Sequence, residues 1–175
     1  MTHEIHDAIL RTGTSTFIRR FCDTLKDMAN VLYAPVPETP ASQIQPENSL
    51  TVIAQFFGTI QGEFLISTSE STAAGIAGKY TPGAATAAIT VHRDSYSGLL
   101  CEALNISAHQ ALPELEKKFG RFTLLPPAWV YGEYHTVDYI SGIGLIKGIH
   151  GAIRCSLVLN MAYTHVPSRP AAMKQ

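Results

Sequence analysis

The sequence predicts a single α/β domain, in which two longer helices lie on a mainly antiparallel sheet built from hairpins. Three observations predict this fold. The length of 175 residues favours one domain over two. Two long stretches show apolar residues at three- and four-residue steps, which is the helical period. Runs rich in β-branched and aromatic residues follow each of these stretches, and turn residues separate them.

The composition excludes several function classes. Charged residues make up 15% of the chain and hydrophobic residues 46%, whereas an ordinary soluble domain has about 25% charged residues. This balance excludes a disordered chain and indicates that a second subunit covers part of the surface, so we expect a homodimer. The net charge is -1, and no run of Lys or Arg is longer than two residues. A nucleic-acid partner is therefore not expected.

The expected location is the cytoplasm. Glu4 and Asp7 stand where a secretory signal would carry lysines before an apolar core. The most apolar late stretch, residues 140–159, is interrupted by charged residues and does not read as a membrane span. The cysteines are far apart and form no CxxC pair, so we expect them to be reduced and buried: Cys22, Cys101 and Cys155.

The first part of the chain is predicted to be a helix followed by a linker. Apolar residues recur with helical period over about residues 15–32, and Gly13 is expected to break or kink any helix that arrives from the N-terminus. Residues 34–47 form a proline-rich, extended linker, because proline is excluded from helix interiors and central strands. The domain core is expected over residues 49–162, followed by a tail at 163–175.

A hairpin and a short helix come next. The β-branched and aromatic runs 50–57 and 62–67 flank a glycine-containing turn and predict two paired strands. Residues 69–79 have small apolar residues on one side and predict a short helix that begins at the Ser69-Glu70 pair. Residues 81–88 are rich in Pro, Gly and Ala and are predicted to be a loop.

The longest predicted helix runs from about residue 94 to 112, and an extension to Phe119 stays open. Pro113 either kinks or ends this helix, because proline removes a helical hydrogen bond. Residues 122–125 and 129–131 then predict short strands, and residues 144–162 fit two more strands.

The long helix carries the main candidate site. At 100° per residue, Glu102, Asn105 and His109 fall within one narrow wedge of the helix. That wedge lies opposite an apolar stripe formed by Tyr96, Leu100, Ala103, Leu104 and Ala111. The simplest interpretation is an ordinary solvated face, which every amphipathic helix has. A functional interpretation needs more than this spacing.

Four segments together resemble the CheX/CheC family of bacterial chemotaxis phosphatases, and CheX most closely. The resemblance covers roughly residues 15 to 160 in one collinear order. It consists of a glycine-spaced hairpin at 57–67, the Ser69-Glu70 helix start, a Glu-x-x-Asn sequence at 102–105, and a Pro-x-x-x-x-Gly sequence at 127–132. Each segment is weakly specific alone, and their order and separation carry the match.

The resemblance implies that the chain hydrolyses the aspartyl phosphate of a CheY-like response regulator. In the family, the glutamate meets a lysine in the regulator's active site and the asparagine positions the attacking water. Those roles fall on Glu102 and Asn105 here. The family also implies that the protein needs no cofactor of its own, and that Mg²⁺ comes with the phosphorylated receiver domain. CheX-like proteins pair through their sheets, which agrees with the expected homodimer.

Two positions beside the motif bear on the contact with the partner, and His109 departs from the family pattern. Gly98 stands four residues before Glu102, where a small or acidic residue is frequent, and His109 stands where glycine is common. Both positions are expected to contact the partner. Only one Glu-x-x-Asn sequence occurs, which favours the single-site CheX-like arrangement over the two-site CheC-like one.

His109 also favours a rival interpretation, a catalytically silent adaptor of the same fold that binds a receiver domain or a flagellar switch component. A small-ligand sensor that uses the hairpin and helix groove is a third and weaker alternative.

Other chemistry has less support in the sequence. The seven histidines show no HxH or HxxxH spacing, so we expect no metal site. Cys101 adjoins Glu102, but no sequence signature supplies the base that a thiol nucleophile needs. The glycine-rich segment 142–148 lacks the Gly-Lys-Ser/Thr ending of a phosphate loop and is interpreted as glycines in or between strands.

Overall fold

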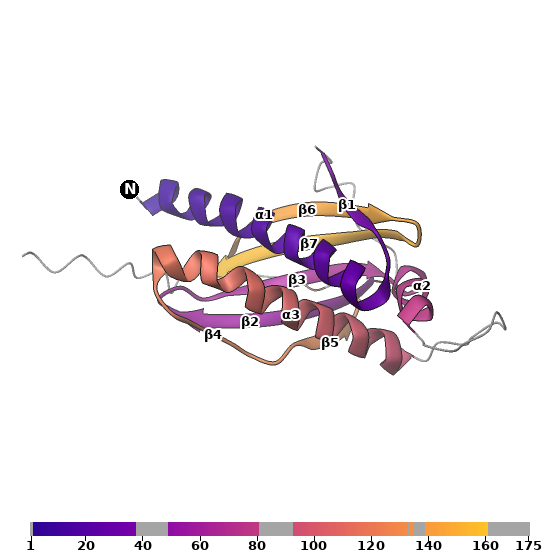
Figure 1. Cartoon of the computed structure of the whole chain (residues 1–175). Helices are drawn as coiled ribbons and strands as arrows, with labels where there is room; N and C mark the ends of the chain where they lie inside the picture. The colour runs from indigo at the N-terminus through magenta and orange to yellow at the C-terminus, as the bar shows by residue number, and fades with distance from the viewer. Residues whose placement is uncertain (1, 38–48, 81–92, 133, 135–138, 161–175) are drawn as a thin grey trace, which may run out of the picture.

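The computed structural model describes residues 2–37, 49–80, 93–132, 134 and 139–160. Over this part of the chain it has two layers, an antiparallel sheet with helices on one of its faces (Figure 1). The two long helices lie side by side across the sheet, and the short helix packs at one end (Figure 1). The predicted fold class is therefore confirmed.

The described residues form three helices and seven strands. The helices are α1 (Thr2–Ala29), α2 (Glu70–Tyr80) and α3 (Arg93–Phe119). The strands are β1 (Tyr33–Val36), β2 (Ser49–Gly58), β3 (Gly62–Ser69), β4 (Phe122–Leu124), β5 (Ala128–Tyr131), β6 (Tyr139–Gly148) and β7 (Gly151–Asn160).

All strand pairs of the sheet are antiparallel, in the order β1-β6-β7-β3-β2-β4. The short strand β5 also pairs with β2, so β4 and β5 cover different halves of the same strand edge. The backbone N–H of Leu125 donates to the carbonyl of Gln55 between them, at 2.8 Å. The four inner strands β6, β7, β3 and β2 are thus paired on both sides.

The main core lies between the sheet and the helices. Alternate residues of a strand point to opposite faces, and one set of these is fully buried under α1 and α3. Aromatic rings join the layers: Phe17 of α1 lies 4.8 Å from Phe64 of β3, and Phe64 lies 5.2 Å from Phe56 of β2, measured between ring centroids. These contacts fix the height of the helix layer above the sheet.

The first helix begins at Thr2, well before the predicted start near residue 15, and Gly13 neither breaks nor ends it. The reason is tertiary packing. A Cβ atom at position 13 would lie 2.5 Å from Cδ2 of Leu157 and 3.1 Å from Cδ2 of Leu115. Glycine is therefore required where α1 passes close to β7 and α3, although its intrinsic helix propensity is poor.

The predicted linker is wrong over its first residues, because residues 33–36 form the edge strand β1. Pro35 lies within this strand, opposite Ile146 of β6. Proline is tolerated at a sheet edge, where the missing N–H would face away from the sheet. Residues 38–47 of the predicted linker, and the loop predicted at 81–88, lie outside the described residues.

The remaining elements agree with the prediction, with shifted ends. The hairpin, the short helix and the two short strands are all present. The long helix does not end at Pro113 but continues to Phe119, which settles the alternative left open by the sequence. Strand β6 begins at Tyr139, before the predicted residue 144. None of the described helices is long and apolar enough to cross a membrane.

Candidate functional site

The outer face of α3 presents the predicted site residues together. Gly98, Glu102 and His109 are exposed, and Asn105 is half-buried. The opposite side of the helix is buried in the core, as predicted, and consists of Tyr96, Leu100, Ala103, Leu104 and Ala111. The residues that helical spacing places in one wedge therefore lie together on the protein surface. A carboxylate, a carboxamide and an imidazole project from it over two turns.

Gly98 keeps this face flat one turn before Glu102. A Cβ atom built at position 98 would meet nothing within 4 Å. Glycine is thus not required there by the packing of this chain, and its effect is to leave open space beside the carboxylate.

The imidazole of His109 is held against the turn that carries Asn105. Its Nδ1 lies 2.9 Å from the backbone carbonyl oxygen of Asn105. Since a carbonyl oxygen only accepts, this contact requires the proton on Nδ1, and Nε2 of the neutral ring is then an acceptor. The backbone carbonyl of His109 is a second acceptor nearby, because Pro113 has no N–H to donate to it as the helix would otherwise do.

A buried hydrogen bond fixes α3 against α1. The hydroxyl of Ser107, which is fully buried, shares its one proton between the carbonyl of Ala103 at 2.6 Å and Oγ1 of Thr24 at 3.1 Å. Thr24 in turn donates to the carbonyl of Arg20 at 2.8 Å. Ser107 lies between Asn105 and His109 in sequence and points the other way, so this contact sets the rotation of the site face about the helix axis.

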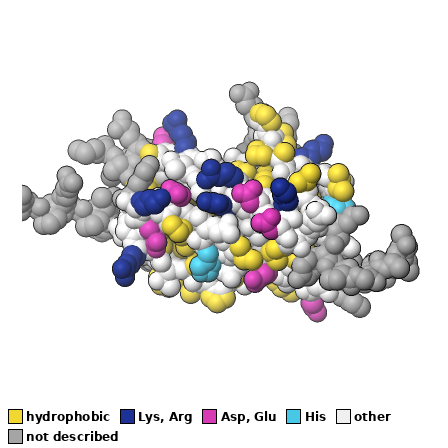
Figure 2. Space-filling model, viewed as in Figure 1, with side chains coloured by type: hydrophobic (Ala, Val, Ile, Leu, Met, Phe, Trp, Pro, Cys, Tyr) yellow, Lys and Arg dark blue, Asp and Glu magenta, His cyan; other side chains and the backbone are white. Residues whose placement is uncertain are grey.

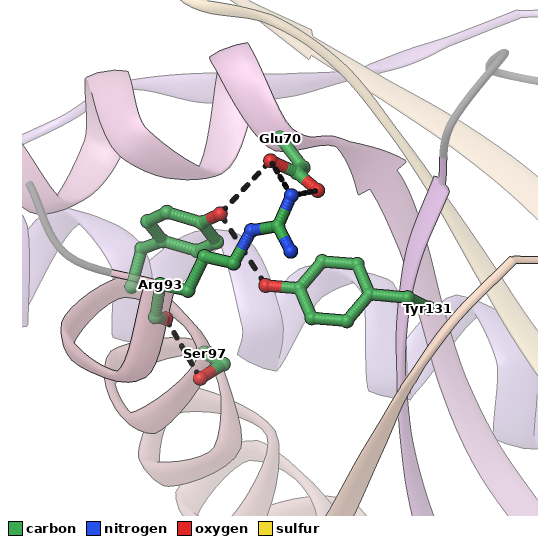
Figure 3. A network of polar contacts seen from close by, with 5 residues as sticks. Glu70, Arg93, Ser97 and Tyr131 are labelled. Carbon is green, nitrogen blue, oxygen red and sulfur yellow. Dashed lines mark hydrogen bonds and ion pairs between the residues drawn. The ribbon is translucent and has the colours of Figure 1, made fainter.

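A second network holds the first turn of α3. Side chains from α2, α3 and β5 converge there (Figure 3). Arg93 forms an ion pair with Glu70 at 3.2 Å, and its guanidinium lies 4.9 Å from the ring centroid of Tyr131. The hydroxyl of Tyr96 donates to Glu70 at 3.1 Å and lies 3.3 Å from that of Tyr131. Burial is the main cause that raises the pKa of Tyr96, so its hydroxyl stays a donor.

Sequence reasoning missed both networks. Ser107 and Thr24 lie 83 positions apart in the sequence, and only the fold brings them together. For the second network, the sequence predicts a helix start at Ser69-Glu70, but nothing in it pairs Glu70 with Arg93 or with Tyr131.

The structure gives no support to thiol or metal chemistry at this face. Burial raises the pKa of the Cys101 thiol, and it raises that of Cys22 to about 11, with the charge of Asp23 as a smaller cause. Both cysteines are half-buried rather than fully buried as predicted, whereas Cys155 is fully buried. In the part of the chain that the structure describes, no three His, Cys, Asp or Glu side chains are grouped as a metal site would need. The glycines of 142–148 lie within β6, as expected.

The charge pattern of the helix face is mixed. Lys, Arg, Asp and Glu side chains are interspersed over the surface that α1 and α3 form (Figure 2). A single-sign surface, which would favour a polyanion or a membrane, is not seen in this view.

Comparison with solved structures identifies the fold. The chain matches chemotaxis protein CheX from Vibrio vulnificus with a TM-score of 0.66 and 16% identity, over 84% of this chain and 95% of that one. The fold is that of the CheX and CheC-like proteins. A CheC-like superfamily protein from Shewanella sp. PV-4 matches with a TM-score of 0.65 and 19% identity, over 85% of this chain and 97% of that one.

A third CheX-like neighbour comes from a complex with its partner. The CheX-CheY-BeF3-Mg²⁺ complex of Borrelia burgdorferi gives a TM-score of 0.64 at 19% identity, over 83% of this chain and 96% of that one. No protein-family model and no curated protein matches the chain by sequence. The likeness therefore confirms the predicted CheX-like fold, and the roles of the site residues stay predictions.

Proposed function

We propose that this chain is a phosphatase that hydrolyses the aspartyl phosphate of a CheY-like receiver domain. The observation that carries the proposal is the placement of Glu102 and Asn105 side by side on the outer face of α3, in a CheX-like fold. A neighbour of the same fold was solved in a complex with CheY, BeF3 and Mg²⁺, which supports a receiver domain as the partner.

The residue types suit the reaction. Water attacks the phosphorus while the bond from phosphorus to the aspartyl oxygen breaks, which gives a free carboxylate and inorganic phosphate. Because the receiver's Mg²⁺ already offsets the charge, the helper protein needs mainly to hold the water in line. The carboxamide of Asn105 can accept from that water and donate to a second atom without adding charge. Glu102, exposed one turn earlier, would form a charge-assisted contact with a lysine of the partner.

The neighbouring residues would shape the contact. Gly98 leaves room for the partner's backbone beside Glu102. His109 would contact the partner through Nε2, which accepts when the ring is neutral. The rigid seating of α3 by Ser107 and by the Arg93 network means that little of this face must be ordered on docking.

The test is the decay of a phosphorylated receiver domain with Mg²⁺, with and without the protein. Several receivers should be tried, with Asn105→Ala and Glu102→Gln as variants and Gln110→Ala as a matched exposed control on the same helix. We expect faster decay that falls about 10²–10³-fold in Asn105→Ala, the typical loss of one positioning group. Glu102→Gln should mainly weaken binding. Decay that is unchanged by the protein, or by Asn105→Ala, would contradict the proposal.

The alternative is an adaptor of the same fold that binds a receiver or a flagellar switch component without catalysis. The seating of His109 over the Asn105 turn favours this alternative, because the imidazole occupies space where the partner must approach closely. It predicts measurable binding with unchanged phosphoryl lifetime. Replacement of His109 by glycine would then confer phosphatase activity, while the first proposal expects activity before any change.

The homodimer is also a proposal. The low charged fraction of 15% supports it. Light scattering at micromolar concentration should give twice the mass of one 19.0 kDa chain, and a monomer mass would exclude it.

A further inference from the structure

A carboxylate is buried on the sheet face opposite α1 and α3. Glu63 of β3 is 4% exposed. The next residue, Phe64, points to the helix layer and packs on Phe17, so Glu63 points to the other face. This side chain therefore takes no part in the site on α3.

Among the described residues, the groups that hydrogen-bond this carboxylate are neutral. Nε2 of Gln55 donates to Oε1 of Glu63 at 2.8 Å, and the hydroxyl of Tyr134 lies 3.1 Å from both carboxylate oxygens. Within the described ranges, no Lys, Arg or His forms an ion pair with Glu63. An ionised carboxylate offers about four acceptor positions, and its burial without an opposite charge is costly. The side chain thus retains acceptor capacity for a cation.

A small cleft lies beside Glu63. Its volume is about 150 Å³, and its lining includes Gln61 and Asn160 in addition to Gln55, Phe57 and Glu63. Pockets for drug-sized ligands and cofactors measure about 300–1,000 Å³. The cleft is therefore of a size for the end of one side chain rather than for a cofactor.

Exposed aromatic side chains lie at the cleft. Phe57, which lines it, is 40% exposed, and Tyr134, whose hydroxyl contacts Glu63, is 37% exposed. A buried charge within an apolar rim is the arrangement of an interface hot spot, where the rim excludes water from the central contact. Such a rim favours a protein as the source of the cation.

We propose that this cleft receives an arginine side chain of a partner protein, with the guanidinium on the Glu63 carboxylate. A guanidinium fits better than an ammonium group, because it is planar, forms two parallel hydrogen bonds to a carboxylate and stacks on aromatic rings such as those of Phe57 and Tyr134. A metal ion fits poorly, since within the described residues Glu63 belongs to no group of three or more His, Cys, Asp or Glu side chains.

The first test uses methylguanidinium chloride, with N-methylurea as a neutral probe of similar shape and NaCl as the salt control. Amide signals of the ¹⁵N-labelled full chain are followed by NMR. Methylguanidinium alone should give saturable shifts at residues 55–57 and 61–63, at roughly millimolar affinity. Glu63→Gln should weaken this binding at least about tenfold. Equal shifts with both probes, no saturable shift, or unchanged binding by Glu63→Gln would overturn the proposal, and the variant's spectrum reports its folding.

The second test identifies the source of the cation. The peptide acetyl-Phe-Arg-Phe-amide should bind more tightly than agmatine, because its apolar neighbours contact the exposed rim, and Phe57→Ala should remove that advantage. The citrulline analogue of the peptide should not bind. Tighter binding of agmatine would assign the cleft to a small free guanidinium compound instead of a protein. A shift of the monomer-dimer equilibrium in Glu63→Gln would assign it to a second copy of this chain. Either outcome would overturn the partner assignment.

Discussion

The two glycines of β6 that lie beneath α1 should respond differently to the same substitution. A methyl group at Gly142 would overlap Oγ1 of Thr14, and it would also lie 3.2 Å from the backbone oxygen of Leu10 and from Cβ of Thr14. A methyl group at Gly144 would overlap only Cδ1 of Ile18, with the next carbon of that side chain 3.7 Å away. The first obstacle includes backbone and a short side chain, whereas the second is the end of a flexible one.

The expected magnitudes follow from these contacts. Overpacking in a core costs about 1–3 kcal/mol, and replacing glycine by alanine at an unstrained position recovers about 0.4–1 kcal/mol through the unfolded chain. Gly142→Ala should therefore lower the free energy of unfolding by about 1–2 kcal/mol. Gly144→Ala should change it by less than about 0.5 kcal/mol, because Ile18 can adopt another rotamer.

Urea unfolding followed by circular dichroism measures this difference as a midpoint shift of roughly 0.5–1 M. Thr14→Ala provides the matched control. Its hydroxyl has no hydrogen-bond partner among the described residues, so the single variant should cost little, and combined with Gly142→Ala it should restore most of the loss. Equal midpoints for the two glycine variants, or no recovery in the double variant, would refute the reasoning.

Three further outcomes are expected. Burial raises the pKa of the Cys22 thiol to about 11 and also raises that of Cys101. Both thiols should therefore react with Ellman's reagent at pH 8 far more slowly than glutathione does, by roughly 100-fold for Cys22. Rapid labelling would contradict their burial. Burial raises the pKa of Tyr33 to about 12, so the folded state holds this proton more tightly than the unfolded state. The free energy of unfolding, measured by urea titration, should therefore fall as the pH rises from 10 to 12, and Tyr33→Phe should make this fall less steep. An unchanged pH dependence in the variant would contradict the role of Tyr33. Ser107→Ala should lower the free energy of unfolding by about 1 kcal/mol. In a double-mutant cycle with Thr24→Val, the two losses of stability should not add. Simple additivity would mean that the hydrogen bond between the two side chains contributes nothing to stability.

Local patterns explain which elements were predictable. The β2–β3 hairpin and α2 have turn residues and a helix start beside them in sequence, and both form where expected. Helical period placed Glu102 and Asn105 on one exposed face, because a continuous helix leaves no other arrangement.

The errors come from contacts between distant segments. Gly13 reads as a helix breaker until Leu115 and Leu157 are brought against it, and then glycine is the residue that fits. Pro35 reads as a linker residue until β6 supplies an edge on which it can lie. Glu63 reads as one hairpin residue among several, and its burial beside Tyr134 depends on a segment 71 positions away.

The pairing of β2 and β3 has a consequence for synthesis on the ribosome. The outer edge of β2 is covered by β4 and β5, and the outer edge of β3 by β7, all of which come later in the chain. Until residue 160 has emerged, the hairpin of residues 49–69 exposes at least one edge rich in β-branched and aromatic residues. Such edges template pairing with other chains. Chains that stop before Phe122 should aggregate as they are made. Full-length nascent chains should depend on chaperones for a longer time than is usual for a protein of this size.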